Sequence, residues 1–329
     1  MQNRQPATIG VDVSKDTLDA AVLFTDNSYA EAQFSNDAKG IKKLLAWAKK
    51  RGARKCPICV EATGGLEIEL CIDGYDAKHP IRVEAPALIA NFRKSLNLRN
   101  KTDGVDARLI ARFAYAIPTG NYWQKPSQAV IALRDALKSR RQLTQCHTDL
   151  GNSIKTMRNA EQKRIMAASL KHLKKQIKKI DATMEAIINQ DEQLTQLYQL
   201  LRSIPGVGLQ TAAILCAVLD NNTFENPKQL AAYIGITPRV KQSGNSEAQT
   251  RITKTGDAHL RSAIFMASLS ARRYNQIIRE FADQLSRRRP ELTKKQVIVA
   301  CARKLAQIIY GVVKNNKPFD PHHECPAAS

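Results

Sequence analysis

The chain has 329 residues, with 51 Lys and Arg against 30 Asp and Glu, which gives a formal net charge of +21. Hydrophobic residues make up 43% and charged residues 25%, proportions that exclude disorder over most of the chain. The first ten residues lack the apolar core of a signal peptide, and no clean apolar run approaches the roughly 20 residues that cross a bilayer. We therefore expect a cytoplasmic protein of two or three domains.

The positive charge is uneven along the chain. Its excess rises from +4 over residues 1–120 to +7 over 121–200 and +10 over 201–329. A field of this kind attracts polyanions over long range. Because no amphipathic membrane anchor is visible, nucleic acid is the expected partner. A generally basic protein is the alternative, and charge does not distinguish binding nucleic acid from cutting it.

The seven cysteines are scattered, which predicts reduced thiols in a chain without an export signal. The single CxxC, Cys56 to Cys59, has no second pair at zinc-ligand spacing and runs into an apolar segment. Buried strand cysteines are therefore expected there, in preference to half a zinc site or a redox pair.

Residues 1–120 alternate between strand and helix patterns, judged from period-two and helical spacing of apolar residues. The expected order is strands over 8–14, 18–24 and 31–34, a helix over 38–50, a strand over 57–62, a helix from 64 to about 78, a strand over 81–84, and helices over 87–96 and 103–116. This order predicts an α/β domain with a mixed sheet, the first three strands forming an antiparallel meander.

Four carboxylates occupy distinctive positions in this domain. Asp12 lies in the middle of the first strand, Glu61 ends the strand after the first helix, and Asp103 and Asp106 share one face if their segment is helical. An acid inside an apolar strand is costly unless something pairs with it. The simpler alternatives are a salt bridge for Asp12, a capping or ribose-type contact for Glu61, and a capping pair at a helix start for Asp103 and Asp106.

Four converging carboxylates would repel one another unless divalent cations neutralise them. Hard oxygen ligands suit Mg²⁺ or Mn²⁺. Two such ions about 3.5–4 Å apart can hold the attacking and leaving oxygens of a phosphodiester. The four carboxylates therefore predict a metal site for phosphoryl transfer on nucleic acid.

Three segments carry a resemblance to a known family: IGVDVSK from residue 9, VEATG from residue 60 and KTDGVDA from residue 101. They resemble the DEDD domain of a bacterial insertion-sequence transposase family, whose fold is ribonuclease-H-like, as in Holliday-junction resolvases. The resemblance implies that a coiled-coil segment follows the DEDD domain, and that a C-terminal transposase domain with a nucleophilic serine comes next. It also implies that a bridge RNA encoded by the element guides recombination, as in the best-described members.

The segment from about residue 127 to 201 contains little Gly or Pro and carries an apolar seam with alternating spacings of three and four, broken at Asp191. Two helices that meet near residues 159–162 would form an antiparallel hairpin or dimerise with another chain; core packing within one monomer is the alternative. The flanking lysines either hold nucleic-acid backbone or form a solvated face. These lysines are Lys171, Lys174, Lys175, Lys178 and Lys179.

The last region opens with IPGVG at residues 204–208, which resembles the turn of a helix-hairpin-helix. There Gly206 and Gly208 would let the backbone approach DNA, and N–H groups at the next helix start would face a phosphate without reading bases. An ordinary tight turn between helices is the alternative.

A polar stretch then runs from Ser243 to Gly256. The pattern from Gly235 to Arg261 resembles the signature of the family's C-terminal domain, and that resemblance makes Ser243 the nucleophile, with Ser246 as runner-up. Composition alone would make Ser243 an ordinary loop serine. Basic residues beside it are expected to contact nucleic acid: Arg239, Lys241, Arg251, Lys254 and Arg261.

The full expectation is a ribonuclease-H-like α/β domain over 1–120, a coiled-coil arm over 121–201, a mostly α-helical transposase domain over 202–317 and a loose tail over 318–329. The resemblance implies a transposase or recombinase that forms a covalent phosphoserine, uses Mg²⁺ or Mn²⁺, and binds donor DNA, target DNA and bridge RNA. It would act at the bacterial nucleoid as a dimer or tetramer. A metal-dependent junction resolvase that needs no serine and a non-catalytic nucleic-acid scaffold are the alternatives.

Overall fold

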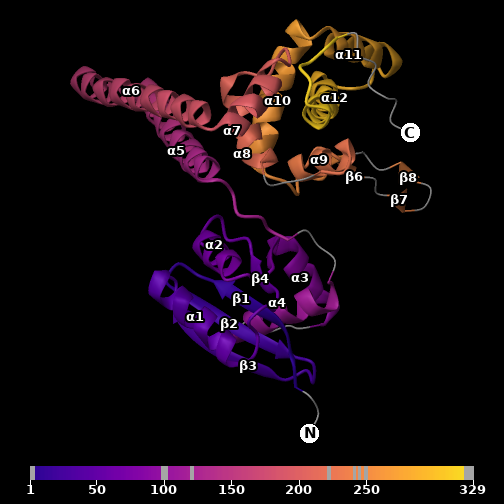
Figure 1. Ribbon diagram of the computed structural model, residues 1–329. Coiled ribbons are helices and arrows are strands. Elements are labelled where there is room, and N and C mark those ends of the chain that lie inside the picture. Colours follow the sequence, from indigo (N-terminus) through magenta and orange to yellow (C-terminus); the bar gives the residue numbers. More distant parts are fainter. Residues whose placement is uncertain are drawn as a thin grey trace. The chain divides into compact units, whose positions relative to one another are not determined.

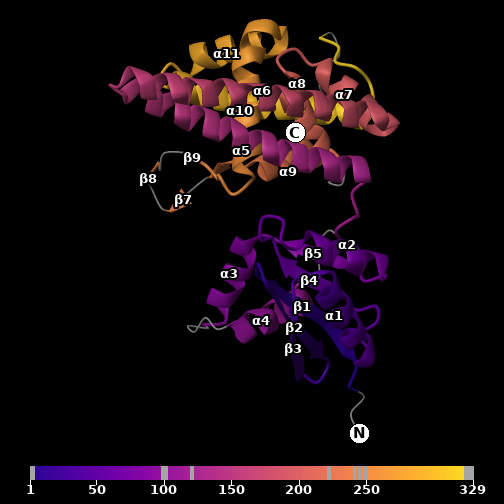
Figure 2. The same cartoon turned by 90° about the vertical axis from the view of Figure 1, so that its left-hand side faces the viewer.

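The computed structural model describes residues 4–97, 103–118, 122–220, 224–239, 242–243, 246–247 and 251–321, with the backbone alone at 103–105, 239, 242–243, 246–247 and 251. The chain folds into two compact units, Met1–Lys125 and Pro126–Ser329 (Figures 1 and 2). Each unit has its own apolar core.

The first unit contains a five-stranded mixed sheet in the order β3-β2-β1-β4-β5. β2 pairs antiparallel with β1 and β3, while β4 runs parallel to β1 and β5. The elements are β1 (Pro6–Val13), β2 (Thr17–Phe24), β3 (Tyr29–Ser35), α1 (Ala38–Lys50), β4 (Ile58–Glu61), α2 (Ile68–Asp76), β5 (Ile81–Glu84), α3 (Pro86–Ser95) and α4 (Asp103–Ala116). The predicted α/β domain with its antiparallel meander is confirmed.

The two faces of this sheet are covered by different helices. Ile9 and Val11 of β1 pack with Ile41 and Leu44 of α1 on one face, together with residues of α2. The opposite face carries Cys59, which packs with apolar residues of α3 and α4. Because successive side chains of a strand point to opposite faces, Thr8, Gly10 and Asp12 lie on the α3 and α4 side. The predicted carboxylate in β1 is therefore on the face that α4 covers.

The second unit is mostly helical. Its elements are α5 (Gln128–Thr156), α6 (Ala160–Gln190), α7 (Glu192–Arg202), α8 (Leu209–Leu219), α9 (Pro227–Ile234), β6 (Pro238–Arg239), β7 (Gln242–Ser243), β8 (Ser246–Glu247), β9 (Arg251–Ile252), α10 (Ala258–Tyr274), α11 (Gln276–Arg288) and α12 (Lys294–Asn315). Asn159 caps α6, and Asp191 ends α6 and caps α7, as the predicted breaks require. Thr293 and Gln296 form the predicted capping box of α12.

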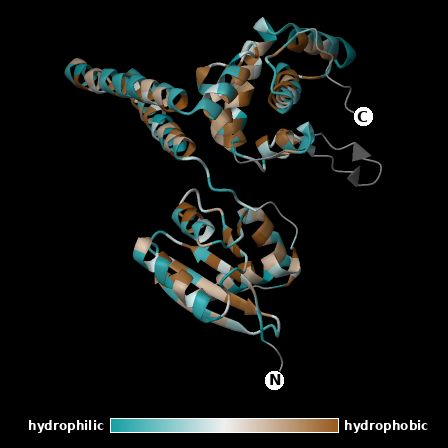
Figure 3. Cartoon of the chain, viewed as in Figure 1, coloured by the Kyte–Doolittle hydropathy of each residue, from teal (hydrophilic) through white to brown (hydrophobic). Residues whose placement is uncertain are grey.

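α5 and α6 pack against each other as a helical hairpin. The base of the hairpin joins the core of the second unit through Val130, Leu133 and Ile188. Between residues 138 and 183, by contrast, every residue is at least partly exposed, including the seam positions Leu173 and Ile177. Figure 3 shows the same segment as largely hydrophilic with separated apolar positions.

α12 has the length and apolar composition of a membrane span, alone among the helices within the described ranges, and half of the qualifying stretch is buried inside the protein. The sequence predicted that no clean apolar run approaches this length, and α12 is not a clean run. Arg303 and Lys304 interrupt the apolar run in the sequence, yet its mean hydropathy stays high. Cys301, Leu305 and Ile309 of this helix lie in the core of the second unit.

The expected reduced thiols are found: Cys56 and Cys59 are unpaired, as are the other cysteines that the structure describes. Burial raises the pKa of the Cys59 thiol to about 12, so this cysteine is an unreactive part of β4. The tail residues His322, His323 and Cys325 lie outside the described residues.

Candidate active site and nucleic-acid interface

A row of carboxylates crosses the sheet on the face that α4 covers. Asp12 of β1 lies directly opposite Asp19 of β2, and Glu61 of β4 pairs in register with Glu84 of β5. β1 and β4 pair through Val11 and Val60, so the next position along this register brings Asp12 beside Glu61. Neighbouring strands are about 4.8 Å apart. The sheet therefore brings together two residues that are 49 positions apart in the sequence.

α4 lies directly on β1 at Gly10. A Cβ atom at Gly10 would meet the carbonyl oxygen of Ala107 and the backbone nitrogen of Ala111, each at 2.3 Å, so only glycine permits this approach. Thr8 donates a hydrogen bond to the carbonyl of Ala111 at 2.9 Å. β1 and α4 therefore run side by side in opposite directions: Thr8 lies at Ala111, and Gly10, two residues further along the strand, reaches Ala107, four residues earlier in the helix.

One further step reaches Asp12 on the strand and the first turn of α4, which contains Asp103. Two strand residues span about 6.6 Å and four helical residues about 6 Å, so the steps match. On this spacing we expect the backbone of Asp103 to come level with Asp12; the Asp103 side chain lies outside the described residues.

Asp106 faces inward on α4 and is 8% exposed. Its carboxylate forms an ion pair with the guanidinium of Arg93, which projects from α3. The structure therefore engages Asp106 with a cationic side chain. The side chain of Glu61 makes no hydrogen bond or ion pair with the residues that the structure describes. The sequence had not indicated Arg93.

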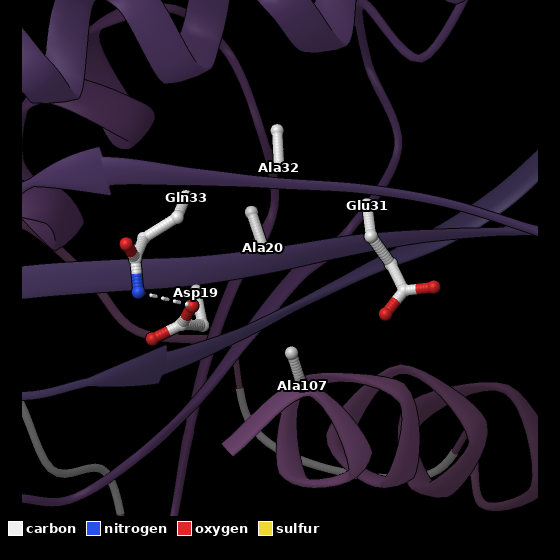
Figure 4. A pocket seen from close by; sticks show the side chains of 6 residues that line it. All are labelled: Asp19, Ala20, Glu31, Ala32, Gln33 and Ala107. Atoms are coloured by element: carbon white, nitrogen blue, oxygen red, sulfur yellow. Dashed lines mark hydrogen bonds between the residues drawn. The ribbon is translucent and has the colours of Figure 1, made fainter.

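Asp19 was also missed by the sequence analysis. It accepts a hydrogen bond from Nε2 of Gln33 at 2.9 Å, and both residues line a cavity of about 220 Å³ between the sheet and α4. Figure 4 shows Asp19 and Glu31 extending from the strands toward the side on which Ala107 of α4 lies. The cavity continues the carboxylate row toward β3.

Within the described residues, no three His, Cys, Asp or Glu side chains form a group that could hold a metal ion. Asp12 and Glu61 nevertheless lie side by side, and the donors of the row are carboxylates. Carboxylate oxygens are the donors that a hard divalent cation prefers.

The predicted nucleophile lies in a small β-hairpin of the second unit. β6 pairs with β9 and β7 pairs with β8, which places Ser243 directly opposite Ser246 in the ladder. The serine side chains, like those of Arg239 and Arg251, lie outside the described residues, and so does all of Lys241. The described backbone of the expected polar loop thus forms two short antiparallel ladders, β6 with β9 and β7 with β8, which we call the ribbon.

The ribbon is fixed at its base, between α9 and α10. A Cβ at Gly256 would lie 1.9 Å from the carbonyl oxygen of Tyr233, and Gly235 ends α9 in the left-handed conformation. Arg261 donates from Nη1 to the carbonyls of Ile234 at 3.2 Å and Gly256 at 3.1 Å. Arg261, expected to contact nucleic acid, therefore also ties the ribbon to the helical body. Lys254, also expected there, is exposed and has a positive φ of 55°.

We expect Gly256→Ala to destabilise the second unit. The new methyl group forces the ribbon away from α9, which costs about 2 kcal/mol and lowers Tm by about 4–8 °C. Gly311→Ala is the matched control: a Cβ there meets no atom within 4 Å, and Ala in a helix interior should raise stability by about 0.5–1 kcal/mol. Thermal unfolding measures both changes, and equal stability of Gly256→Ala and wild type would contradict this packing.

The turn between α7 and α8 has two glycines with different environments. Gly206 has a φ of +103°, and a Cβ there would lie 2.5 Å from the Cα of Ala271 in α10. Its small size thus serves helix packing. Gly208 begins α8 without a side-chain cap, and a Cβ there meets no atom within 4 Å. The predicted approach of nucleic acid therefore remains a prediction, with Gly208 as the open position.

His259, near the start of α10, is half-buried. Burial lowers its pKa, and the charge of Arg141 on α5 lowers it further. The ring is accordingly neutral at pH 7, which suits a hydrogen-bonding role better than a cationic contact with phosphate.

Comparison with known proteins finds two matching regions, the first of which extends beyond the first unit through α5. Residues 9–159 match a transposase domain of the DEDD type, and residues 198–283 match the IS116/IS110/IS902 transposase family. The pilin gene-inverting protein of Moraxella lacunata is 33% identical over 327 residues, covering 95% of this chain and 97% of its own. The corresponding protein of Moraxella bovis is equally similar over the same length. A transposase for insertion sequence element IS1111A from Coxiella burnetii is 31% identical over 126 residues, 37% of this chain and 34% of its own.

The chain combines a sheet that bears a carboxylate row with a basic helical unit, and its sequence is similar to those of these proteins. It is therefore a DNA transposase or recombinase. The chain belongs to the IS116/IS110/IS902 family of transposases. Its DEDD-type domain indicates that activity depends on a divalent metal.

Proposed function

We propose that this enzyme cleaves, exchanges and rejoins DNA strands through a DEDD site and the nucleophile Ser243, with an RNA of its own element as guide. The proposal is supported by the parallel pairing of β1 with β4 through Val11 and Val60 and by the close approach of α4 to β1 at Gly10. Continued along both elements, these contacts would bring Asp12 and Glu61 beneath the first turn of α4. This arrangement supports a ribonuclease-H-like fold for the first unit.

Asp12, Glu61, Asp103 and Asp106 would hold Mg²⁺, or Mn²⁺ in its place. The metal supplies charge stabilisation at the reacting phosphate when bound. The carboxylates would fix its position, because hard oxygen donors suit such an ion.

Ser243 would supply the attacking oxygen. Its Oγ forms a bond to the scissile phosphorus while the bond from phosphorus to the leaving deoxyribose oxygen breaks. The serine proton passes to a carboxylate or water, and the leaving oxygen takes up a proton. The phosphoserine conserves the energy of the phosphodiester, so a second DNA end can reverse the step and be joined.

The proposal requires that the serine ribbon and the carboxylate row form one composite site, within one subunit or between two. The α5 and α6 seam supports a dimer or tetramer, because apolar residues such as Leu173 and Ile177 are only half-buried by a two-helix hairpin. A second copy of the hairpin would cover them.

Guide RNA and both DNA partners would bind the basic second unit. The lysines of α6, Lys171, Lys174, Lys175, Lys178 and Lys179, are all exposed. Their charge suits phosphate contacts that carry no sequence information. An RNA would then supply the choice of sequence, in a protein that acts on DNA in the cytoplasm at the nucleoid.

A strand-transfer assay with purified protein, labelled donor and target DNA, and RNA transcribed from the element tests this function. We expect joined product only when Mg²⁺ or Mn²⁺ and the RNA are both present, and none with EDTA. Product formed at an equal rate without RNA would contradict RNA guidance while leaving the metal requirement intact.

A metal-dependent junction resolvase is the second candidate, since the carboxylate row alone suffices for hydrolysis. Its expected result in the same assay is cut DNA without joined product. Inversion of a DNA segment, the activity in the name of the Moraxella relatives, would instead require joining and favours the recombinase.

A further inference from the structure

We infer that Arg93 is a positioning residue that holds Asp106 when no divalent ion is bound and gives up this carboxylate when the metal enters. The inference rests on the metal site proposed above. The starting observation is the ion pair between Arg93 of α3 and Asp106 of α4, in which the Asp106 side chain is 11% and the Arg93 side chain 21% exposed.

The counter-charge at Asp106 is needed because a buried carboxylate without a partner is unstable. A metal ion and a guanidinium both satisfy this need; Arg93 contacts Oδ1 of Asp106, and a metal would draw on the charge of the same carboxylate. Occupation of Asp106 by Arg93 therefore opposes occupation by a metal. Either cation keeps the inward face of α4 folded on the sheet.

Arg93 differs from the neighbouring buried arginine in how completely it is bonded. Arg82 of β5 donates to Glu84 from Nε and Nη2 and to the carbonyls of Ala114 and Ile117 from Nη1. In Arg93, Nε is buried without a hydrogen-bond partner in the part of the chain that the structure describes. The hydrogen bonds of Arg82 are satisfied, which fits a structural role. The buried Nε of Arg93 is desolvated without a compensating hydrogen bond, and release of Arg93 would let this group be hydrated again.

Release of Arg93 also has a chemical consequence for the reaction. α3 and α4 pack together through Phe92 and Phe113, so the guanidinium stays within side-chain reach of the site after it leaves Asp106. A free guanidinium is suited to bidentate contact with a phosphate group. Metal entry would thus convert Arg93 from a carboxylate partner into a DNA phosphate ligand.

The test is to measure Mn²⁺ binding to the full-length protein without DNA. Electron paramagnetic resonance reports the concentration of free Mn²⁺ in each titration. Arg93→Gln should bind Mn²⁺ about tenfold more tightly than wild type, because the competing charge is gone. Arg93→Lys should stay within about threefold of wild type. Arg108→Gln is the matched control, since Arg108 pairs from α4 with Glu31 of β3 at an exposed position, and it should leave the affinity unchanged.

Thermal unfolding of the same variants supplies a second readout. Arg93→Gln should lower Tm in EDTA, and this deficit should shrink by at least half in saturating Mn²⁺, because the ion replaces the lost counter-charge. An ordinary salt bridge would give the same deficit in both conditions. Unchanged or weaker Mn²⁺ binding by Arg93→Gln, or a metal-independent deficit, would overturn the role of Arg93. If wild type bound no Mn²⁺, or if Asp12→Asn left its Mn²⁺ binding intact, the proposed metal site itself would be overturned.

Discussion

Asp12→Asn should reduce DNA strand cleavage and joining by about 10³-fold while the protein remains folded. The substitution removes one charge from the centre of the carboxylate row, where Asp12 adjoins Glu61 across the sheet. Charge stabilisation by a properly held metal is worth several kcal/mol, and each 1.36 kcal/mol corresponds to a factor of ten in rate. Rates of strand transfer with purified protein measure the loss.

Asp19→Asn is the control for this prediction. Asp19 lies directly opposite Asp12 in the ladder, and its Oδ1 accepts a hydrogen bond from Gln33. Asn keeps the acceptor oxygen, so the rate should stay within about tenfold of wild type. If Asp12→Asn and Asp19→Asn lowered the rate equally, the row would act as a general negative surface and not as a specific metal site.

Ser243→Ala should abolish joining, with a loss of about 10⁴-fold or more, as expected when the nucleophile of a covalent mechanism is removed. The substitution deletes one oxygen from a short β-ribbon whose base is held by Gly256 and Arg261. The fold should therefore be unaffected. Recombination of a reporter element in bacterial cells measures the effect, with protein abundance checked by immunoblot.

Ser246→Ala is the natural comparison, since Ser246 pairs with Ser243 in the ladder. Recombination by this variant should remain within a few-fold of wild type. The opposite result, with Ser246 essential and Ser243 dispensable, would move the nucleophile across the ribbon. If both single variants kept full activity, neither serine would be the nucleophile.

The first unit was largely predictable because its strands are short apolar runs bounded by turns, with clear period-two alternation in β3. The predicted order of strands and helices is found, and Glu61 indeed ends β4. Asp19 could have been found as well. Residues 14–16 join β1 to β2, and counting outward from this connection places Asp19 opposite Asp12. The pairing follows from hairpin register alone.

Arg93 could not have been found in this way. Its pairing with Asp106 depends on how α3 packs on α4, and nothing in the spacing of the two residues specifies this contact. Gly206 illustrates the same limit: the IPGVG turn predicts a close approach, but the approaching partner is Ala271 of α10, 65 residues later. The prediction of Ser243 as nucleophile rests on family resemblance, since a serine before glycine has no distinctive local pattern.

The central claim, that Ser243 becomes covalently joined to DNA at a metal-dependent carboxylate site, is tested most directly by a denaturing trapping gel. Purified protein, element RNA, Mg²⁺ and labelled donor and target DNA are mixed, denatured and separated. We predict a labelled protein–DNA adduct that disappears in Ser243→Ala, in Asp12→Asn and with EDTA. Free cut DNA in the same amount from wild type and Ser243→Ala, with no adduct from either, would contradict the claim and identify a hydrolytic nuclease.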